Sequence, residues 1–319
     1  YDGSAVSCLY SGGTAIIMKQ AKGLFIIMKI LNFGSINIDY VYSVNHIVKP
    51  GETIKGTGRN VFCGGKGLNQ SIALANAKAD VYHAGLIGED GGMLLEALCN
   101  AGVHTDLIQK VKGSSSHTFI QVDSYGQNSI LFYAGDNLII KEDFISEVIQ
   151  KFEPGDYLLL QNEIGSVPQI MEKAWEKGMK IIFNPSPIHE SVKKYPLERV
   201  HIFMLNEIEG SILTGFTSPD AIIDSMMDAF PNARTILTLG KDGALYGYRG
   251  EKSFQEAYQT DVVDTTAAGD TFTGFFLAAF IDNRPVPDAL RLAAKAAAIS
   301  VSRHGAAPSI PKMYEVERD

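Results

Sequence analysis

The sequence contains 319 residues, of which 45% are hydrophobic and 20% are charged, an ordinary composition for a globular protein with a large core. The formal net charge is −8 and no run of Lys or Arg occurs, which argues against nucleic acid or an acidic membrane as the main partner. No stretch approaches the ~18 consecutive apolar residues of a transmembrane helix. The three cysteines are scattered without a CxxC pair, a usage that favours a reducing, cytoplasmic compartment.

Residues 1–27 differ from the rest of the chain. They are rich in Ser and Gly, contain short apolar pieces, and are followed by Met28-Lys29-Ile30. They lack the charged front and small-residue cleavage site of a clear secretory signal. We therefore expect an extension outside the fold over residues 1–27 and one folded domain over residues 28–315.

A buried strand and a polar turn open this domain. Ile30 to Gly34 is a short apolar run that ends in glycine. Asn37 and Asp39 follow where a loop leaves the carboxyl edge of a parallel sheet, the edge at which ligands bind in open α/β folds. A ligand site and a simple polar turn remain equal alternatives for these two residues.

Two β-prone patches come next. Residues 40–62 contain short pieces broken by Pro50-Gly51, and Phe119–Asp123 and Ser129–Tyr133 flank turn residues as in a β-hairpin. We expect them to form a small β-sheet lid, built from about residues 38–63 and 115–135 and lying over the main domain.

A glycine-rich segment, Gly64 to Gln70, lies between the patches and opens an Ala-rich helix. Glycines let the backbone approach a ligand closely, and Lys66 and Asn69 face the same way because they are three residues apart at a helix start. A cation beside an amide suits hydroxyl groups or phosphate, although a solvated helix start explains the pair equally well.

From Val81 onward, strands and helices alternate. Continuous apolar runs at residues 157–161, 180–184, 201–205 and 236–239 are separated by helical segments. Strands that are apolar on both faces predict a parallel sheet covered on each side by helices.

The segment from Val263 to Phe272 predicts the end of a strand, a small-residue loop and the start of a long apolar helix. Uncovered backbone N–H groups at such a helix start bind anions. Asp270 would lie beside them in the first turn, which suggests phosphoryl transfer with Asp270 as the base. A helix merely capped by Asp is the simpler alternative.

Other nucleotide and hydrolase motifs are missing from the sequence. No G-x-x-x-x-G-K-[ST], G-x-G-x-x-G after a strand, protein-kinase signature or G-x-S-x-G occurs, and the histidines are dispersed. A P-loop enzyme, a dinucleotide-dependent dehydrogenase and a Ser-His-Asp hydrolase are therefore disfavoured.

Two motifs, Gly64 to Gln70 and Asp264 to Phe272, together resemble the signatures of the ribokinase (PfkB carbohydrate kinase) family. The resemblance extends in order from about Met28 to Pro311. It implies an α/β fold: a ribokinase-like three-layer α/β/α sandwich with a mostly parallel central sheet and a small β-sheet lid. It also implies transfer of the ATP γ-phosphoryl group to the primary hydroxyl of a sugar, with D-ribose and its 5-phosphate as the first pair to expect.

The resemblance assigns roles by position. Asp270 matches the catalytic base, and the backbone N–H groups of Ala267, Ala268, Gly269 and Asp270 match an anion hole. The sugar-holding positions are Asn37, Asp39, Gly65, Lys66, Asn69, Glu163 and Asp270. The nucleotide positions are Asn206, Thr238, Gly240, Lys241, Gly243, Gly269 and Ala294, and Glu209 matches a residue that organises Mg²⁺ through water. A K⁺ site beside the anion hole is implied at Asp264, Thr266, Ser300, Arg303, Gly305 and Ser309, mostly through carbonyl oxygens.

Departures from the family pattern leave the sugar open. His117, Thr118 and Phe132 stand where family members tend to have smaller aliphatic residues, and Asp136 replaces a small residue. Each pocket contact changes specificity by about 1–3 kcal/mol. A kinase of another furanose, a nucleoside or a keto-deoxy sugar therefore stays possible, as does a non-catalytic sugar or nucleotide sensor on the same fold. A β-rich lid also has exposed edges, so we expect a homodimer whose lids pack together, as the resemblance implies too.

Overall fold

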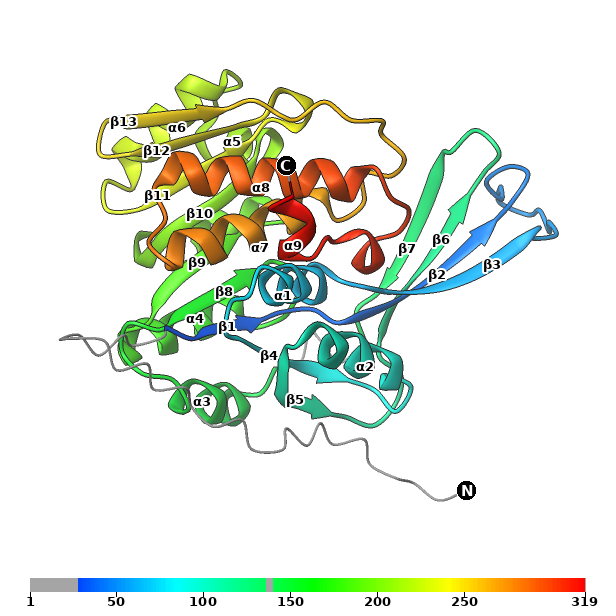
Figure 1. Cartoon of the computed structure of the whole chain (residues 1–319). Coiled ribbons are helices and arrows are strands. Elements are labelled where there is room, and N and C mark those ends of the chain that lie inside the picture. Colours follow the sequence, from blue (N-terminus) through cyan, green and yellow to red (C-terminus); the bar gives the residue numbers. More distant parts are fainter. Residues whose placement is uncertain (1–27, 136–139, 319) are drawn as a thin grey trace.

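The computed structural model of the chain describes residues 28–135 and 140–318. The expectations for residues 1–27 and for Asp136 lie outside the described residues. The described chain forms a large sheet with helices on both faces and a small sheet that projects from the main body (Figure 1). No helix in these ranges is long and apolar enough to cross a membrane.

The large sheet has nine strands in the order β13-β12-β11-β10-β9-β8-β1-β4-β5. The strands from β5 to β11 in this order pair in parallel, and β12 and β13 add an antiparallel edge. The bounds are β1 Ile30–Phe33, β4 Val81–Ile87, β5 His104–Lys110, β8 Tyr157–Gln161, β9 Lys180–Asn184, β10 Val200–Asn206, β11 Arg234–Thr238, β12 Ala244–Tyr248 and β13 Glu251–Gln255. The four apolar runs recognised in the sequence are β8 to β11, so the prediction of a mostly parallel sheet is confirmed.

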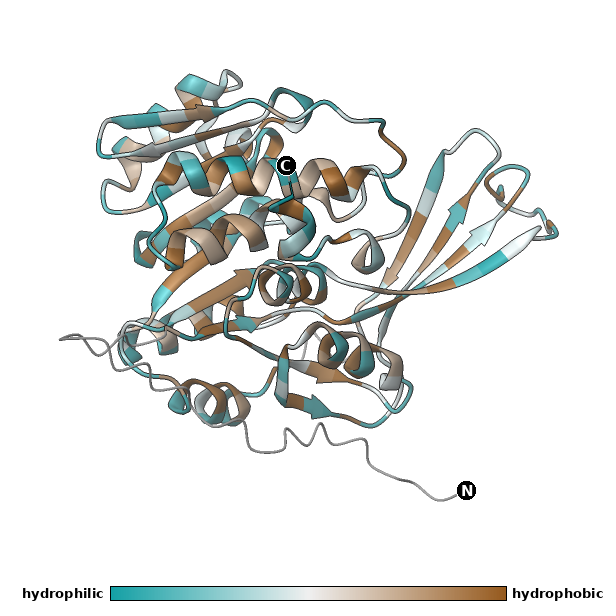
Figure 2. Ribbon diagram, viewed as in Figure 1, coloured by the Kyte–Doolittle hydropathy of each residue, from teal (hydrophilic) through white to brown (hydrophobic). Residues whose placement is uncertain are grey.

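Helices cover both faces of this sheet. The bounds are α1 Lys66–Asn76, α2 Gly92–Ala101, α3 Glu142–Gln150, α4 Val167–Lys177, α5 Glu207–Thr214, α6 Pro219–Ala229, α7 Ala268–Ile281, α8 Val286–Val301 and α9 Met313–Val316. Successive strand residues face opposite layers: Leu159 packs in the core shared with α1, α7 and α8, whereas Leu158 packs in the core shared with α3, α4 and α6. Figure 2 shows the hydrophobic residues along these central strands. The predicted three-layer sandwich is thus observed.

The small sheet contains four strands in the order β3-β2-β6-β7. Their bounds are β2 Asn37–Ser43, β3 Gly58–Gly64, β6 Ser116–Val122 and β7 Asn128–Tyr133. β6 and β7 form the predicted antiparallel hairpin, while β2 and β6 pair in parallel. The strands fall within the expected lid segments to within a residue. Every residue of β7 is exposed, so this edge strand has no protein cover among the described residues.

Candidate active site

One large cavity lies where the small sheet, α1, the start of α7 and the carboxyl ends of the central strands meet. Its volume is about 960 Å³, within the range of small-molecule sites. Predicted site residues along its wall are Asn37, Asp39, Gly65, Lys66, Asn69, Glu163, Asn206, Glu209, Thr238, Thr266, Ala267, Gly269 and Asp270. Residues that are far apart in the sequence therefore contribute to one site.

Asp270 lies in the first turn of α7, on the cavity wall and almost fully buried. Its carboxylate accepts hydrogen bonds from two side chains of α1: Asn69 Nδ2 donates to Oδ2 at 3.0 Å and Gln70 Nε2 donates to Oδ1 at 2.9 Å. Together the two hydrogen bonds fix the orientation of the carboxylate. The simpler alternative of a capping Asp is not observed, because the Ala267 position that precedes α7 has no side-chain cap.

Backbone N–H groups form the second part of the site. Ala267 adopts the left-handed conformation with φ 62°, unusual for a residue other than glycine and typical of functional turns. The Ala268 N–H donates to the Thr265 carbonyl at 3.3 Å, so it is not one of the free donors expected from the sequence. Within the described chain, the N–H groups of Gly269 and Asp270 have no acceptor, as the first turn of a helix dictates. Two amide donors remain for an anion.

Lys66 and Glu163 line the cavity together with Asp270. Glu163 Oε2 accepts the Lys66 backbone N–H at 2.9 Å and also the Ser35 hydroxyl. Burial raises the pKa of Glu163, partly offset by the positive charge of Lys66. Burial works against the Lys66 charge, but the carboxylates of Asp270, Glu163 and Glu209 outweigh it and raise the pKa of Lys66. The ammonium group of Lys66 therefore stays charged and can attract an anionic ligand.

Asp39 lies on the small sheet side of the cavity. Its Oδ1 accepts a hydrogen bond of 2.6 Å from the Thr118 hydroxyl on the neighbouring strand β6. Burial raises the pKa of Asp39, opposed by this hydrogen bond. Nearby, Gly65 has φ 94°, and a Cβ there would lie 3.0 Å from the Ser35 carbonyl oxygen, so the backbone needs glycine at this position.

Asn206 and Glu209 cap helix α5 as well as lining the cavity. The Glu209 N–H donates to Asn206 Oδ1, and both Glu209 oxygens accept from Asn206, each bond measuring 2.9 Å. Burial raises the pKa of Glu209. The Glu209 carboxylate already accepts two hydrogen bonds from Asn206. Protein-bound Mg²⁺ usually keeps several water ligands and binds substrate phosphates, so this carboxylate suits contact with Mg²⁺ through a bound water rather than direct ligation. No cluster of three acidic, His or Cys residues that could hold a metal occurs in the described ranges.

The other predicted nucleotide residues lie outside the cavity wall. Gly240 and Lys241 belong to a short 3-10 helix, Gly240–Asp242, and Gly243 follows it. Ala294 is buried in the core formed with α7 rather than exposed to the cavity. Of the predicted loop between β11 and β12, only Thr238 lines the cavity.

The residues predicted to hold K⁺ lie in two adjacent segments: the loop before α7, and the end of α8 with the turn and short 3-10 helix (Ala307–Ser309) that follow it. Asp264 accepts hydrogen bonds from the Thr266 N–H at 2.9 Å, from the Thr266 hydroxyl at 2.6 Å and from the Gly305 N–H at 3.0 Å. The Ser300 and Ser309 hydroxyls contact each other at 2.8 Å and are fully buried. These two oxygen-rich segments fit a hard monovalent cation.

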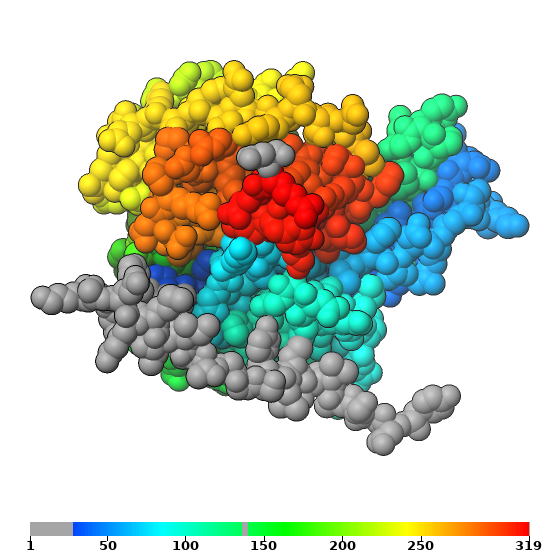
Figure 3. Space-filling view, in the orientation of Figure 1, coloured from blue at the N-terminus to red at the C-terminus, as the bar shows by residue number. Residues whose placement is uncertain are grey.

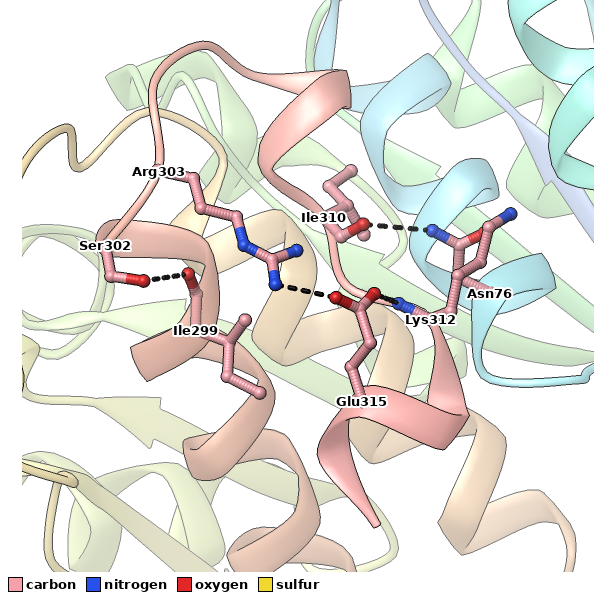
Figure 4. Close-up of polar contacts among 7 residues, drawn as sticks. All are labelled: Asn76, Ile299, Ser302, Arg303, Ile310, Lys312 and Glu315. Carbon is pink, nitrogen blue, oxygen red and sulfur yellow. Dashed lines mark hydrogen bonds and ion pairs between the residues drawn. The ribbon is translucent and has the colours of Figure 1, made fainter. Parts of the chain in front are cut away.

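The Arg303 side chain has a different partner. It donates to Glu315 at 2.7 Å, and Glu315 also accepts the Lys312 backbone N–H at 2.7 Å (Figure 4). Lys312 in turn donates to Asn76 at the end of α1 at 2.6 Å. Figure 3 shows this last segment packed on the surface between α8 and α1. The Arg303 side chain thus links the turn after α8 to the C-terminal segment. Because this side chain is bound to Glu315, only the backbone of Arg303 could contact a cation at the predicted K⁺ site.

Two side chains that contact candidate site residues were missed from the sequence. Gln70 stands inside the glycine-rich motif but received no role, although it contacts Asp270. Ser35, which donates to Glu163, stands two residues before the assigned residue Asn37. Gln70 directly follows Asn69 in the glycine-rich motif, and that position was the available signal.

Comparisons with known proteins agree with this geometry. The model of the pfkB family carbohydrate kinases matches residues 28–313. The chain is 34% identical to ribokinase from Haemophilus influenzae, over 88% of this chain and 95% of that protein. It is 29% identical to deoxyribokinase from Salmonella typhi, over 90% of this chain and 97% of that protein. Among solved structures, Arabidopsis thaliana ribokinase complexed with ribose and ATP superposes with a TM-score of 0.80 at 30% identity, covering 91% of this chain and 98% of that one.

Family membership follows from the length of the match and from the identity to the relatives. The chain therefore belongs to the pfkB family of carbohydrate kinases and is a phosphotransferase with an alcohol group as acceptor.

Proposed function

We propose that this kinase transfers the γ-phosphoryl group of ATP to the primary hydroxyl of D-ribose and produces D-ribose 5-phosphate. The supporting observation is that the Asp270 carboxylate, the free amides of Gly269 and Asp270, and Lys66 all face one cavity. The relatives named ribokinase, one of them bound to ribose and ATP, support the same substrate pair.

In the proposed step, the sugar hydroxyl lies against Asp270 and its oxygen attacks the γ-phosphorus. The proton of the hydroxyl passes to the Asp270 carboxylate as the new O–P bond forms, and the bond from the γ-phosphorus to the leaving oxygen of ADP breaks. The amides of Gly269 and Asp270 stabilise negative charge on the transferred phosphoryl group. A donor of this kind contributes about 3 kcal/mol to lowering a barrier.

Two cations complete the proposal. Glu209 would hold Mg²⁺ through water, and Mg²⁺ would neutralise phosphate charge. The loops with Asp264 and Gly305 would hold K⁺, which fixes the loop that precedes Asp270. We expect K⁺ to raise kcat in the wild type, and Asp264→Asn to abolish that stimulation.

A second candidate substrate is 2-deoxy-D-ribose or another furanose. The observation in its favour is the Thr118 hydroxyl, which occupies one acceptor oxygen of Asp39. An Asp39 carboxylate with fewer free lone pairs can hold fewer sugar hydroxyls. The relative named deoxyribokinase shows that this activity occurs among similar proteins.

The test is a coupled ADP-release assay with D-ribose, 2-deoxy-D-ribose, D-fructose and adenosine at equal concentrations. D-ribose should give the highest kcat/KM. Highest turnover with 2-deoxy-D-ribose or D-fructose would transfer the assignment to the second candidate, and no turnover with any pentose would remove the D-ribose assignment. Binding of sugar or ATP without any turnover would favour a non-catalytic sensor.

We also propose a homodimer through the small sheet. Ile130, Leu131, Phe132 and Tyr133 are exposed on its edge strand β7, and an exposed apolar edge is stable when another surface covers it. Light scattering at working concentration should give twice the monomer mass, and a monomeric mass would contradict the proposal. We propose a cytoplasmic location because ATP is supplied there, which fractionation of cells can check.

A further inference from the structure

A chain of buried polar side chains runs from Asp270 into the core. Gln70 Nε2 donates to Asp270, and Gln70 Oε1 accepts from Gln161 Nε2 at 2.7 Å. Gln161 Nε2 also donates to Asn32 Oδ1 at 3.0 Å. Asn32 Nδ2 then donates to the Ser71 hydroxyl at 2.8 Å. Four elements, α7, α1, β8 and β1, are joined by these bonds.

The far end of the chain is anchored at His83 on β4. The Ser71 hydroxyl lies 2.7 Å from His83 Nδ1, and His83 Nε2 lies 3.3 Å from the Gly34 carbonyl oxygen. Because a carbonyl can only accept, Nε2 carries the hydrogen and Nδ1 accepts from Ser71. Burial lowers the pKa of His83 to about 4, so the ring is neutral at physiological pH, as this tautomer requires.

Each link in the chain therefore has one direction. The Ser71 hydroxyl donates to His83 and must accept from the amide of Asn32. Asn32 then presents its oxygen to Gln161, and Gln161 must donate to Gln70. Gln70 is left with its amide nitrogen facing Asp270. Turning any one amide over would place two oxygens or two nitrogens against each other.

One atom shows the cost of this arrangement. Gln161 Oε1 is buried and has no hydrogen-bond partner among the described residues. An orphaned buried acceptor costs about 1–3 kcal/mol. Gln161 keeps this orientation because its side-chain nitrogen donates to both Asn32 and Gln70. A buried oxygen left without a partner indicates that the orientation of this amide is fixed by more than core packing.

The chain lies behind the site rather than in it. Gln70, Gln161, Asn32, Ser71 and His83 are all nearly or fully buried, and none is among the described residues that line the cavity. They can influence a bound sugar only through the cavity residues that they contact: Gln70 Nε2 donates to Asp270 at 2.9 Å and, more weakly, to Asn184 at 3.3 Å.

We propose that Gln70 and Gln161 are positioning residues for phosphoryl transfer: their fixed amides hold the Asp270 carboxylate in the orientation that meets the sugar hydroxyl. This inference rests on the proposed role of Asp270 as base. Misplacing a reacting group by about 1 Å costs up to 10²-fold in rate. Neither residue contacts the cavity, so sugar and ATP binding should be nearly independent of them.

The test compares Gln70→Met and Gln161→Met with the wild type in steady-state kinetics for sugar and ATP. Methionine keeps the length of the side chain and removes both the donor and the acceptor. We expect kcat to fall about 10- to 100-fold for Gln70→Met and about 5- to 20-fold for Gln161→Met, with both KM values within threefold of the wild type. Where Gln161→Met does not fold, Ser71→Ala removes only the hydroxyl link to His83 and should lower kcat about threefold.

The matched control is Asp156→Leu, immediately before the start of strand β8 rather than at its carboxyl end, where Gln161 lies. Asp156 is also buried and accepts two hydrogen bonds, from the Lys29 and Glu153 N–H groups at 3.0 and 2.9 Å, outside the chain that reaches Asp270 and away from the cavity wall. This variant should lose thermal stability to a similar degree while keeping kcat. Unchanged kcat in folded Gln70→Met, or equal loss of kcat in the control, would overturn the positioning role. An inactive wild type, or an Asp270→Asn variant with wild-type rates, would instead refute the proposed function.

Discussion

Asn69 and Asp270 are separated by 201 positions in the sequence and are joined by a hydrogen bond of 3.0 Å across the α1–α7 contact. Asn69 also lines the cavity, and its Oδ1 is buried without a partner in the described structure. The Asn69 amide nitrogen holds the proposed base, and the same residue forms part of the wall against which we propose that the sugar binds. Asn69 thus contributes to both the proposed base and the proposed sugar site.

Replacing Asn69 by Ala should therefore affect both binding and rate. A hydrogen bond to a charged group is worth about 1.5–3 kcal/mol, so we expect kcat/KM to fall about 10- to 100-fold, with a higher KM for the sugar and a lower kcat. Steady-state kinetics measure both. A change in kcat alone would show that Asn69 positions Asp270 without touching the sugar.

The spacing of α1 and α7 should matter as much as the side chains. A Cβ at Gly274 would lie 2.8 Å from the Ala73 carbonyl carbon and 2.8 Å from the Leu74 nitrogen, both backbone atoms of α1. Gly274→Ala should force the helices apart, lower the free energy of unfolding by about 1–3 kcal/mol and reduce kcat. Urea unfolding and kinetics check this. Gly92→Ala, where a Cβ meets nothing within 4 Å, is the control and should be neutral, and equal behaviour of the two variants would refute the argument.

Thr118 should influence the choice of sugar. Thr118→Val keeps the shape of the side chain and frees the Asp39 oxygen that the Thr118 hydroxyl now occupies. A freed carboxylate oxygen can accept one more sugar hydroxyl, so the ratio of kcat/KM for D-ribose over 2-deoxy-D-ribose should rise about tenfold, a contact of roughly 1–3 kcal/mol. An unchanged ratio would show that Thr118 has no part in specificity.

The buried His83 should make stability depend on pH. Its pKa is about 4 in the folded protein against 6.5 ordinarily, so the unfolded chain binds more protons between these values. Stability from this group is fully present above pH 6.5 and is lost as the pH falls towards 4, by about 2 kcal/mol between pH 7 and pH 5.

The variant His83→Gln separates this contribution from others. Burial raises the pKa of Glu163, Glu209 and Asp39, and those groups act in the opposite direction, losing stability as the pH rises through their folded pKa values. The free energy of unfolding should thus fall more steeply for the wild type than for His83→Gln between pH 7 and pH 5. Parallel curves would contradict the neutral, buried state of His83.

Much of the fold could be predicted because its determinants are local. Apolar runs such as Tyr157–Gln161 have the period and length of buried strands, and the turn residues between β6 and β7 predicted their hairpin. The gathering of most candidate residues around one cavity could be predicted because motif residues such as Lys66 and Asp270 lie at the starts of helices that begin at the cavity wall. The roles of these residues stay predictions.

The remainder depends on tertiary contacts that no local pattern encodes. Gln161 was read only as the last residue of an apolar strand, and its link to Gln70 exists because β8 lies behind α1 in the folded chain. Ala268 was expected to offer a free amide, but the turn at Ala267 directs it to Thr265. Ala294 was expected among the nucleotide positions; it packs in the core with α7 and does not line the cavity.

The most direct test of the central claim is the rate and position of phosphorylation of D-ribose by the wild type and by Asp270→Asn. With ATP and Mg²⁺, phosphorus NMR of the wild-type product should show a phosphate ester on the primary C5 oxygen. Asp270→Asn, which keeps the shape of the side chain but cannot accept the proton, should lower kcat by about 10²–10⁴ with little change in the KM for ATP. An ester at another oxygen, or a variant as fast as the wild type, would contradict the account.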